Sequence, residues 1–299
     1  MAQAIDQGRA DRPLWRQIID FPLVAMVLAV ALYALATTLG YSVGKLLPSL
    51  GQPWTALAKM LIMLGFVVPM YKLAISRLGE HPRDDLPATT ALPQLGKGIA
   101  VGALLFCIVA AIAALLGAYR ITGRDDPSDL LLPLISSAVM PAFMEELLFR
   151  GILFRWIEEF GGSWAALIIT SALFGMAHSL NPGATLFSSF CVAVEAGLLL
   201  GGAYMLTRSL WMPIGLHAAW NYTQGPILGV PVSGNEVHGI FQAKLSGPVI
   251  LSGGSFGLEA SVIAIAVCTA AGLWLIWVAV KRDALIQPWW VRRRALNSA

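Results

Sequence analysis

The sequence predicts an all-α fold, a polytopic membrane bundle of about eight transmembrane helices that forms one integral membrane domain over residues 1–299. Hydrophobic residues make up 57% of the chain and charged residues only 12%, about half the ~25% typical of soluble domains. The mean hydropathy is +0.72. Apolar runs long enough to cross a hydrocarbon core of ~30 Å occupy nearly the whole chain. No room remains for a sizeable soluble domain.

Charge and cysteine usage exclude other classes of protein. The net charge is only +3, and the positive residues lie in short segments beside the apolar runs. This pattern is typical of residues that orient a membrane protein, and it argues against nucleic acid as a partner. Cys107, Cys191 and Cys268 lie singly in separate apolar runs, so neither a disulfide framework nor a thiolate metal site is indicated.

The first half of the chain is predicted to contain three spans. Residues 21–44 carry no charge, and this run is too long for the apolar part of a cleaved signal peptide, so it forms an uncleaved first span. A turn at 48–53 leads to a second span that ends near residue 71. Residues 72–97 combine Lys and Arg with three prolines, which indicates a cytoplasmic loop. The third span is expected at 98–119.

The second half is predicted to contain five more spans. A polar turn before residue 130 supplies caps for the first of them, and Gly161 and Gly162 break it. The end of this helix, with Arg150, Arg155, Glu158 and Glu159, is expected to be amphipathic. The five spans cover residues 130–160, 163–180, 184–207, 210–223 and 260–280.

The segment 225–258 is rich in Gly and Pro and is expected to form a loop or a re-entrant lid. Lys and Arg gather at both ends of the chain, in residues 1–20 and 281–299. By the positive-inside rule both termini should be cytoplasmic, which requires an even number of spans and agrees with eight. We therefore expect a multi-pass protein of the cell (inner) membrane.

The run Met144-Glu145-Glu146-Leu147-Leu148-Phe149-Arg150 places three charges inside an apolar helix. Such charges are costly unless they are paired or face a watery cavity. Glu146 and Arg150 are four residues apart and lie on one face, where they can form an ion pair. Glu145 lies about 100° away around the helix. Without a local partner, it is a candidate general base toward water.

Two further pairs of polar residues could complete a catalytic site. His178 lies 16 residues after Gly162 and Glu145 lies 16 before Gly161, so a hairpin turning at the glycines would bring both to one depth, roughly 24 Å from the turn. His178 could share the water of Glu145 or protonate a leaving amine. His217 and Asn221, again four residues apart, could donate hydrogen bonds to an oxyanion.

Three ordered motifs, Glu145-Glu146-x-x-x-Arg150, Phe174-x-x-x-His178 and His217-x-x-x-Asn221, resemble those of the CPBP family. This family comprises the type II CAAX prenyl endopeptidases and the bacteriocin-processing or Abi-like membrane proteins. The motif-bearing core covers residues 130–225. The resemblance implies an intramembrane endopeptidase in which Glu145 and His178 activate water, His217 and Asn221 stabilise the oxyanion, and Glu146 and Arg150 support the first motif. It also implies CAAX-type protein substrates.

Other interpretations remain open. Glu145, His178 and His217 are candidate ligands of one divalent metal such as zinc, and the family is commonly labelled as metalloproteases; the absence of an HExxH helix favours a mechanism without metal. An ion-coupled or proton-coupled transporter is an alternative, although no inverted repeat is found. A non-catalytic immunity or scaffold protein is another. In each case membrane lipid is a partner, and for a protease the substrate is a membrane-embedded or lipid-modified protein. Glu195 receives no role from the motifs.

Overall fold

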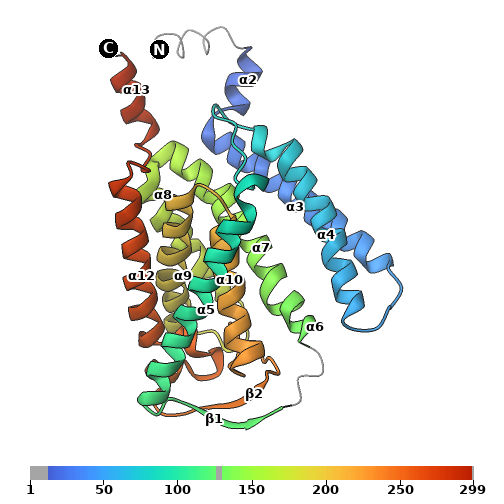
Figure 1. The fold of residues 1–299 in the computed structure, drawn as a ribbon. Helices are drawn as coiled ribbons and strands as arrows, with labels where there is room; N and C mark the ends of the chain where they lie inside the picture. Colours follow the sequence, from blue (N-terminus) through green and yellow to red (C-terminus); the bar gives the residue numbers. More distant parts are fainter. Residues whose placement is uncertain (1–12, 126–129, 298–299) are drawn as a thin grey trace.

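The computed structural model describes residues 13–125 and 130–297 of the chain (Figure 1). The predicted all-α membrane bundle is confirmed, with 74% of the described residues helical. Six of the described helical segments are long and apolar enough to cross a membrane. Helices α2 (Leu14–Ile19) and α13 (Trp289–Asn297) lie at one end of the bundle, and a two-stranded sheet lies at the other (Figure 1).

The first two long helices, α3 (Pro22–Leu46) and α4 (Trp54–Leu73), form a hairpin. Small residues let them approach each other, because a Cβ atom at Gly40 would lie 3.0 Å from Sδ of Met63. Such close approach is the common basis of helix association in membranes. Tyr33 of α3 reaches the motif-bearing helix, where its hydroxyl donates to the carbonyl oxygen of Met144 over 3.1 Å.

The third span begins earlier than predicted, since α5 covers Ala91–Leu115. The prediction placed Pro93 in a loop, but it occupies the first turn of the helix, where no intrahelical partner for its nitrogen is needed. After α5 the chain enters strand β1 (Tyr119–Arg124), which pairs antiparallel with β2 (Phe241–Leu245). This sheet was not predicted from the sequence.

Residues 131–178 form one long helical segment that turns back at Gly162, where φ is 83°. A positive φ is readily adopted by glycine, so the predicted break lies at this residue and Gly161 stays helical. The segment therefore supplies two crossings. Its parts are α6 (Leu131–Pro133), the π-helix η3 (Leu134–Val139), α7 (Met140–Glu146), the π-helix η4 (Leu147–Phe154) and α8 (Arg155–His178).

Three of the remaining helices, at Leu186–Thr207, Trp211–Tyr222 and Val262–Lys281, agree with the predicted spans, although the second of them, α10, is only 12 residues long and is too short to count among the six. Helix α10 packs tightly on α5: a Cβ atom at Gly98 would lie 2.2 Å from the carbonyl oxygen of Met212, and one at Gly102 would lie 2.2 Å from that of Leu216. These elements are α9 (Leu186–Thr207), α10 (Trp211–Tyr222), the π-helix η5 (Thr223–Ile227), α11 (Val249–Ser252), the 3₁₀-helices η6 (Gly254–Phe256) and η7 (Leu258–Ala260), and α12 (Val262–Lys281).

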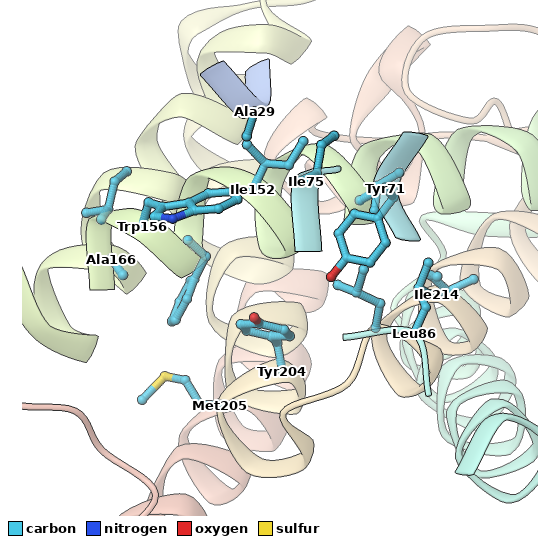
Figure 2. Packing of buried hydrophobic residues seen from close by; sticks show 14 of the residues in the cluster. Ala29, Tyr71, Ile75, Leu86, Ile152, Trp156, Ala166, Tyr204, Met205 and Ile214 are labelled. Atoms are coloured by element: carbon cyan, nitrogen blue, oxygen red, sulfur yellow. The ribbon is translucent and has the colours of Figure 1, made fainter. Parts of the chain in front are cut away.

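The main hydrophobic core joins α3 and α4 to the helices that carry the motifs. Figure 2 shows Ala29, Tyr71, Trp156 and Tyr204 among the buried side chains of this cluster. Its members come from α3 and α4 and from α7, η4, α8, α9, α10 and α12, so the core fixes the N-terminal hairpin against the rest of the bundle. Further residues labelled in the cluster are Ile75, Leu86, Ile152, Ala166, Met205 and Ile214.

The start of α8 was predicted to be amphipathic, but this prediction is wrong, because its charged residues are buried. Arg155 is 0% exposed. The connection between α4 and α5 folds over it, and its guanidinium donates to the carbonyl oxygens of Arg83 (2.8 Å) and His81 (3.2 Å) and lies 3.7 Å from Asp85. Glu158 pairs in the same way with Arg208. Partners from distant segments thus replace the water that an amphipathic helix would face.

Candidate functional site

The two adjacent glutamates lie where α7 meets the π-helix η4, and they face different surroundings. Glu146 is fully buried and forms the predicted ion pair, with Nη1 of Arg150 2.8 Å from its Oε1. Arg150 also donates to the carbonyl oxygen of Ala196 over 3.1 Å and lies over the ring of Phe174, 4.7 Å from its centroid. The arginine therefore joins α7, α8 and α9 at the site. π-helical turns of this kind are frequent at functional sites.

Glu146 has a second partner that the sequence did not reveal. Nδ1 of His217 lies 3.0 Å from the same Oε1 atom. The two residues are 71 positions apart, so no helical spacing could have indicated the contact. The carboxylate thus fixes the orientation of the imidazole, as a second partner commonly does for a functional histidine.

His178, the last residue of α8, is held by its own helix. Its Nδ1 atom lies 2.8 Å from the carbonyl oxygen of Phe174. Because a carbonyl only accepts, the hydrogen is on Nδ1 and the lone pair of the neutral ring is on Nε2. The Phe174 ring packs against both histidines, with centroids 4.6 Å from His178 and 6.1 Å from His217. Phe174 is therefore a positioning residue. In the sequence it was recognised only as part of the second motif.

Glu145 is the more exposed of the pair, with 33% of its side chain accessible. Its Oε2 atom lies 4.0 Å from Nε2 of His217 and has no hydrogen-bond partner within the described chain. Asn221, one turn after His217, donates from Nδ2 to the carbonyl oxygen of Ser137 in η3 over 3.0 Å. A primary amide has two N–H groups, so one remains for a ligand.

One cavity of about 320 Å³ brings these groups together. Glu145, His178, His217 and Asn221 all line it, so the structure unites the four sequence-predicted candidates from α7, α8 and α10. The turn at 232–235, which lies in the segment 225–258 expected to form a loop or a re-entrant lid, closes part of its wall. Its lining also includes Asn181, in the connection between α8 and α9, and Val237, four residues before β2, so the cavity lies toward the sheet end of the bundle.

The three candidate metal ligands do not form a suitable cluster in this arrangement. Within residues 13–125 and 130–297, no group of three or more His, Cys, Asp or Glu side chains is placed to hold a metal ion. His217 Nε2 and Glu145 Oε2 lie 4.0 Å apart, but within the described residues no third side chain of these types joins them in a group that could hold an ion.

Comparison with known proteins adds one finding. Residues 127–223 match the family model described as type II CAAX prenyl endopeptidase Rce1-like. The resemblance predicted from the three motifs is confirmed over this part of the chain, and it supports a protease of the CAAX endopeptidase type. No curated protein and no solved structure matches the chain significantly.

Proposed function

We propose that the chain is an intramembrane endopeptidase that hydrolyses a peptide bond in a membrane-embedded or lipid-modified protein. The observation that carries this proposal is the convergence of Glu145, His178, His217 and Asn221 on one cavity. Each histidine has one ring nitrogen fixed by a partner, so the opposite nitrogen is available for chemistry. The family match supports a substrate of the CAAX type.

The reaction needs no nucleophile from the protein. A water between Glu145 and Nε2 of His178 gives one proton to this pair while its oxygen attacks the scissile carbonyl carbon. The oxyanion accepts hydrogen bonds from the free N–H of Asn221 and from Nε2 of His217, which carries a hydrogen when the ring is an imidazolium facing two carboxylates. The C–N bond then breaks, the electron pair goes to nitrogen, and nitrogen takes the proton from the Glu145–His178 pair. The products are a carboxylic acid and an amine.

The direct test is cleavage of a defined substrate by the purified protein. A transmembrane peptide with a dye and a quencher on the two sides of the bond, reconstituted with the protein in lipid vesicles, should be cut at one position. Mass spectrometry of the fragments should show addition of one water. A protein that binds the peptide and never cuts any member of a peptide library contradicts the proposal and favours the scaffold alternative.

We expect proteolysis without a bound metal, because the candidate ligands do not form a cluster. Purified protein should contain much less than one equivalent of zinc, and chelators should leave turnover unchanged. Element analysis and turnover before and after chelation check this. Stoichiometric zinc that is lost together with activity in a His178→Ala variant would show the expectation to be wrong.

The positive residues predict how the bundle sits in the membrane. The end with α2 and α13 carries most of them, whereas the sheet end carries few, and cytoplasmic segments are enriched in Lys and Arg. Single cysteines in residues 13–20, 72–90 and 281–295 should therefore react from the cytoplasm, and cysteines in β1 or β2 from the opposite side.

The active-site cavity would then open on the non-cytoplasmic side. Labelling with a membrane-impermeant reagent decides this, and α2 and α13 on opposite sides would contradict the eight-span topology. The positive residues of α2, of the last turn of α4 and the connection after it, and of the segment from the last turn of α12 through α13 are Arg16, Lys72, Arg77, Arg83, Lys281, Arg282, Arg292, Arg293 and Arg294, and those of β1 and β2 are Arg120, Arg124 and Lys244.

A further inference from the structure

A second cavity of about 40 Å³ adjoins the catalytic cavity. His178, His217, Asn221 and Ser233 line both of them, so a substrate bound at the catalytic residues lies next to this smaller space. Side chains of α9 and α10 form most of its wall, and most of them are apolar. The volume exceeds the ~10–15 Å³ that one water needs.

Two carboxylic acids interrupt the apolar wall, and the proposed mechanism uses neither. Glu195 of α9 is 4% exposed, and its Oε2 atom has no hydrogen-bond partner within the described chain. Glu259 of η7 is 3% exposed, and its Oε1 atom likewise has no partner. No Lys or Arg among the described residues forms an ion pair with either acid. Buried polar atoms are normally hydrogen-bonded, so each acid keeps one carboxyl oxygen that a ligand could engage.

Glu259 is held in place even though it lacks a counter-charge. Burial raises its pKa to about 7, while hydrogen bonds from the side chain and backbone of Ser233 and from the side chain of Gln224 act in the opposite direction. Ser233 adopts a positive φ of 48° in the turn at 232–235. Outside glycine such a conformation is costly. The turn that closes the catalytic cavity is therefore tied to the acid that lines the second cavity.

A cavity with apolar walls and two carboxyl groups is complementary to the side chain of lysine or arginine. The methylene groups of Lys or Arg can pack on the walls, and the cationic head supplies the charge that both carboxylates lack. His178 and His217 are the basic residues in the lining, and their Nδ1 atoms are already engaged by the carbonyl oxygen of Phe174 and by Glu146. A metal ion fits less well, because the described residues contain no cluster of three ligands.

We propose that this cavity is a specificity subsite that binds a lysine or arginine side chain of the substrate within two residues of the scissile bond, through Glu195 and Glu259. The proposal rests on the proposed proteolytic function and names a feature of its substrate. A neutral side chain of the same length would leave both acids unpaired. The protein should therefore distinguish substrates by the charge of this side chain and not only by its size.

The test uses matched peptides that carry Lys, norleucine or Glu at each position flanking the bond. Binding is measured by fluorescence anisotropy with the Glu145→Gln protein, which should bind peptide without cutting it, and turnover is measured with the unmodified protein. We expect the Lys peptide to bind at least ~10-fold more tightly than the norleucine peptide, with the difference appearing in KM, as is typical of a charge-assisted hydrogen bond. The Glu peptide should bind worst.

Replacing Glu195 by Gln in the same protein should bring the ratio of Lys to norleucine affinity close to one. Glu236→Gln, which changes an exposed acid of the neighbouring segment, should preserve the ratio. If the Glu195 variant fails to fold, Glu259→Gln provides the same comparison. Equal affinity of the Lys and norleucine peptides at every position overturns the subsite. Cleavage without preference leaves the proposed function intact, whereas tight binding of the Lys peptide without cleavage supports the subsite and overturns the proposed function.

Discussion

Replacing Glu145 by Gln is expected to lower turnover by at least ~10²-fold while the protein remains folded. The substitution keeps the size of the side chain and its capacity to accept a hydrogen bond, but it removes the group that takes the proton from water. Glu145 is one-third exposed to the cavity and makes no ion pair with Lys or Arg among the described residues, so an amide in its place leaves no unpaired cation. Turnover of the labelled peptide and the melting temperature check the two halves of this prediction.

Phe174→Leu is the matched control for geometry. The backbone carbonyl that holds Nδ1 of His178 is kept, but the ring between the two histidines is lost. A smaller loss of turnover than in the Glu145 variant would agree with a positioning role for Phe174. A Glu145→Gln protein that stays fully active would remove Glu145 from the mechanism, whatever the other variants do.

The spans and the first motif could be predicted because their signals are local. Apolar runs reveal crossings, and a spacing of four residues on a helix reveals the pair of Glu146 and Arg150. The reversal at Gly162 could be predicted for the same reason, since glycine is the residue that adopts a positive φ readily. The resemblance of the three ordered motifs then placed the second and third motifs with the first.

What the sequence could not supply depends on contacts between distant segments. The bond between Glu146 and His217 joins α7 to α10, and the burial of Arg155 depends on a connection more than 70 residues away. Strands β1 and β2 each find a partner only through folding of the whole chain. Glu195 could be seen as a charge in an apolar helix, but only the structure shows that it shares a cavity with Glu259 beside the catalytic residues.

Replacing Glu146 by Gln is expected to destabilise the protein by about 3–5 kcal/mol, because it leaves a buried cation without its counter-charge. Arg150 is fully buried, and its remaining described hydrogen bond is to the carbonyl oxygen of Ala196. Asp84→Asn is the matched control: it breaks an ion pair with Lys72 whose side chains are 34% and 44% exposed, and such surface pairs contribute only ~0–1 kcal/mol.

The double variant Glu146→Gln/Arg150→Met separates stability from catalysis. It removes the cation together with its partner, so part of the lost stability should return. Turnover should nevertheless stay low, because the variant lacks the Glu146 carboxylate that lies 3.0 Å from Nδ1 of His217 and fixes the ring. The negative charge that favours the imidazolium form of His217 is lost as well. Melting temperature and turnover of the single and double variants decide between the two roles. Recovery of full turnover along with stability would mean that Glu146 serves only to neutralise Arg150, and that His217 does not depend on it in the reaction.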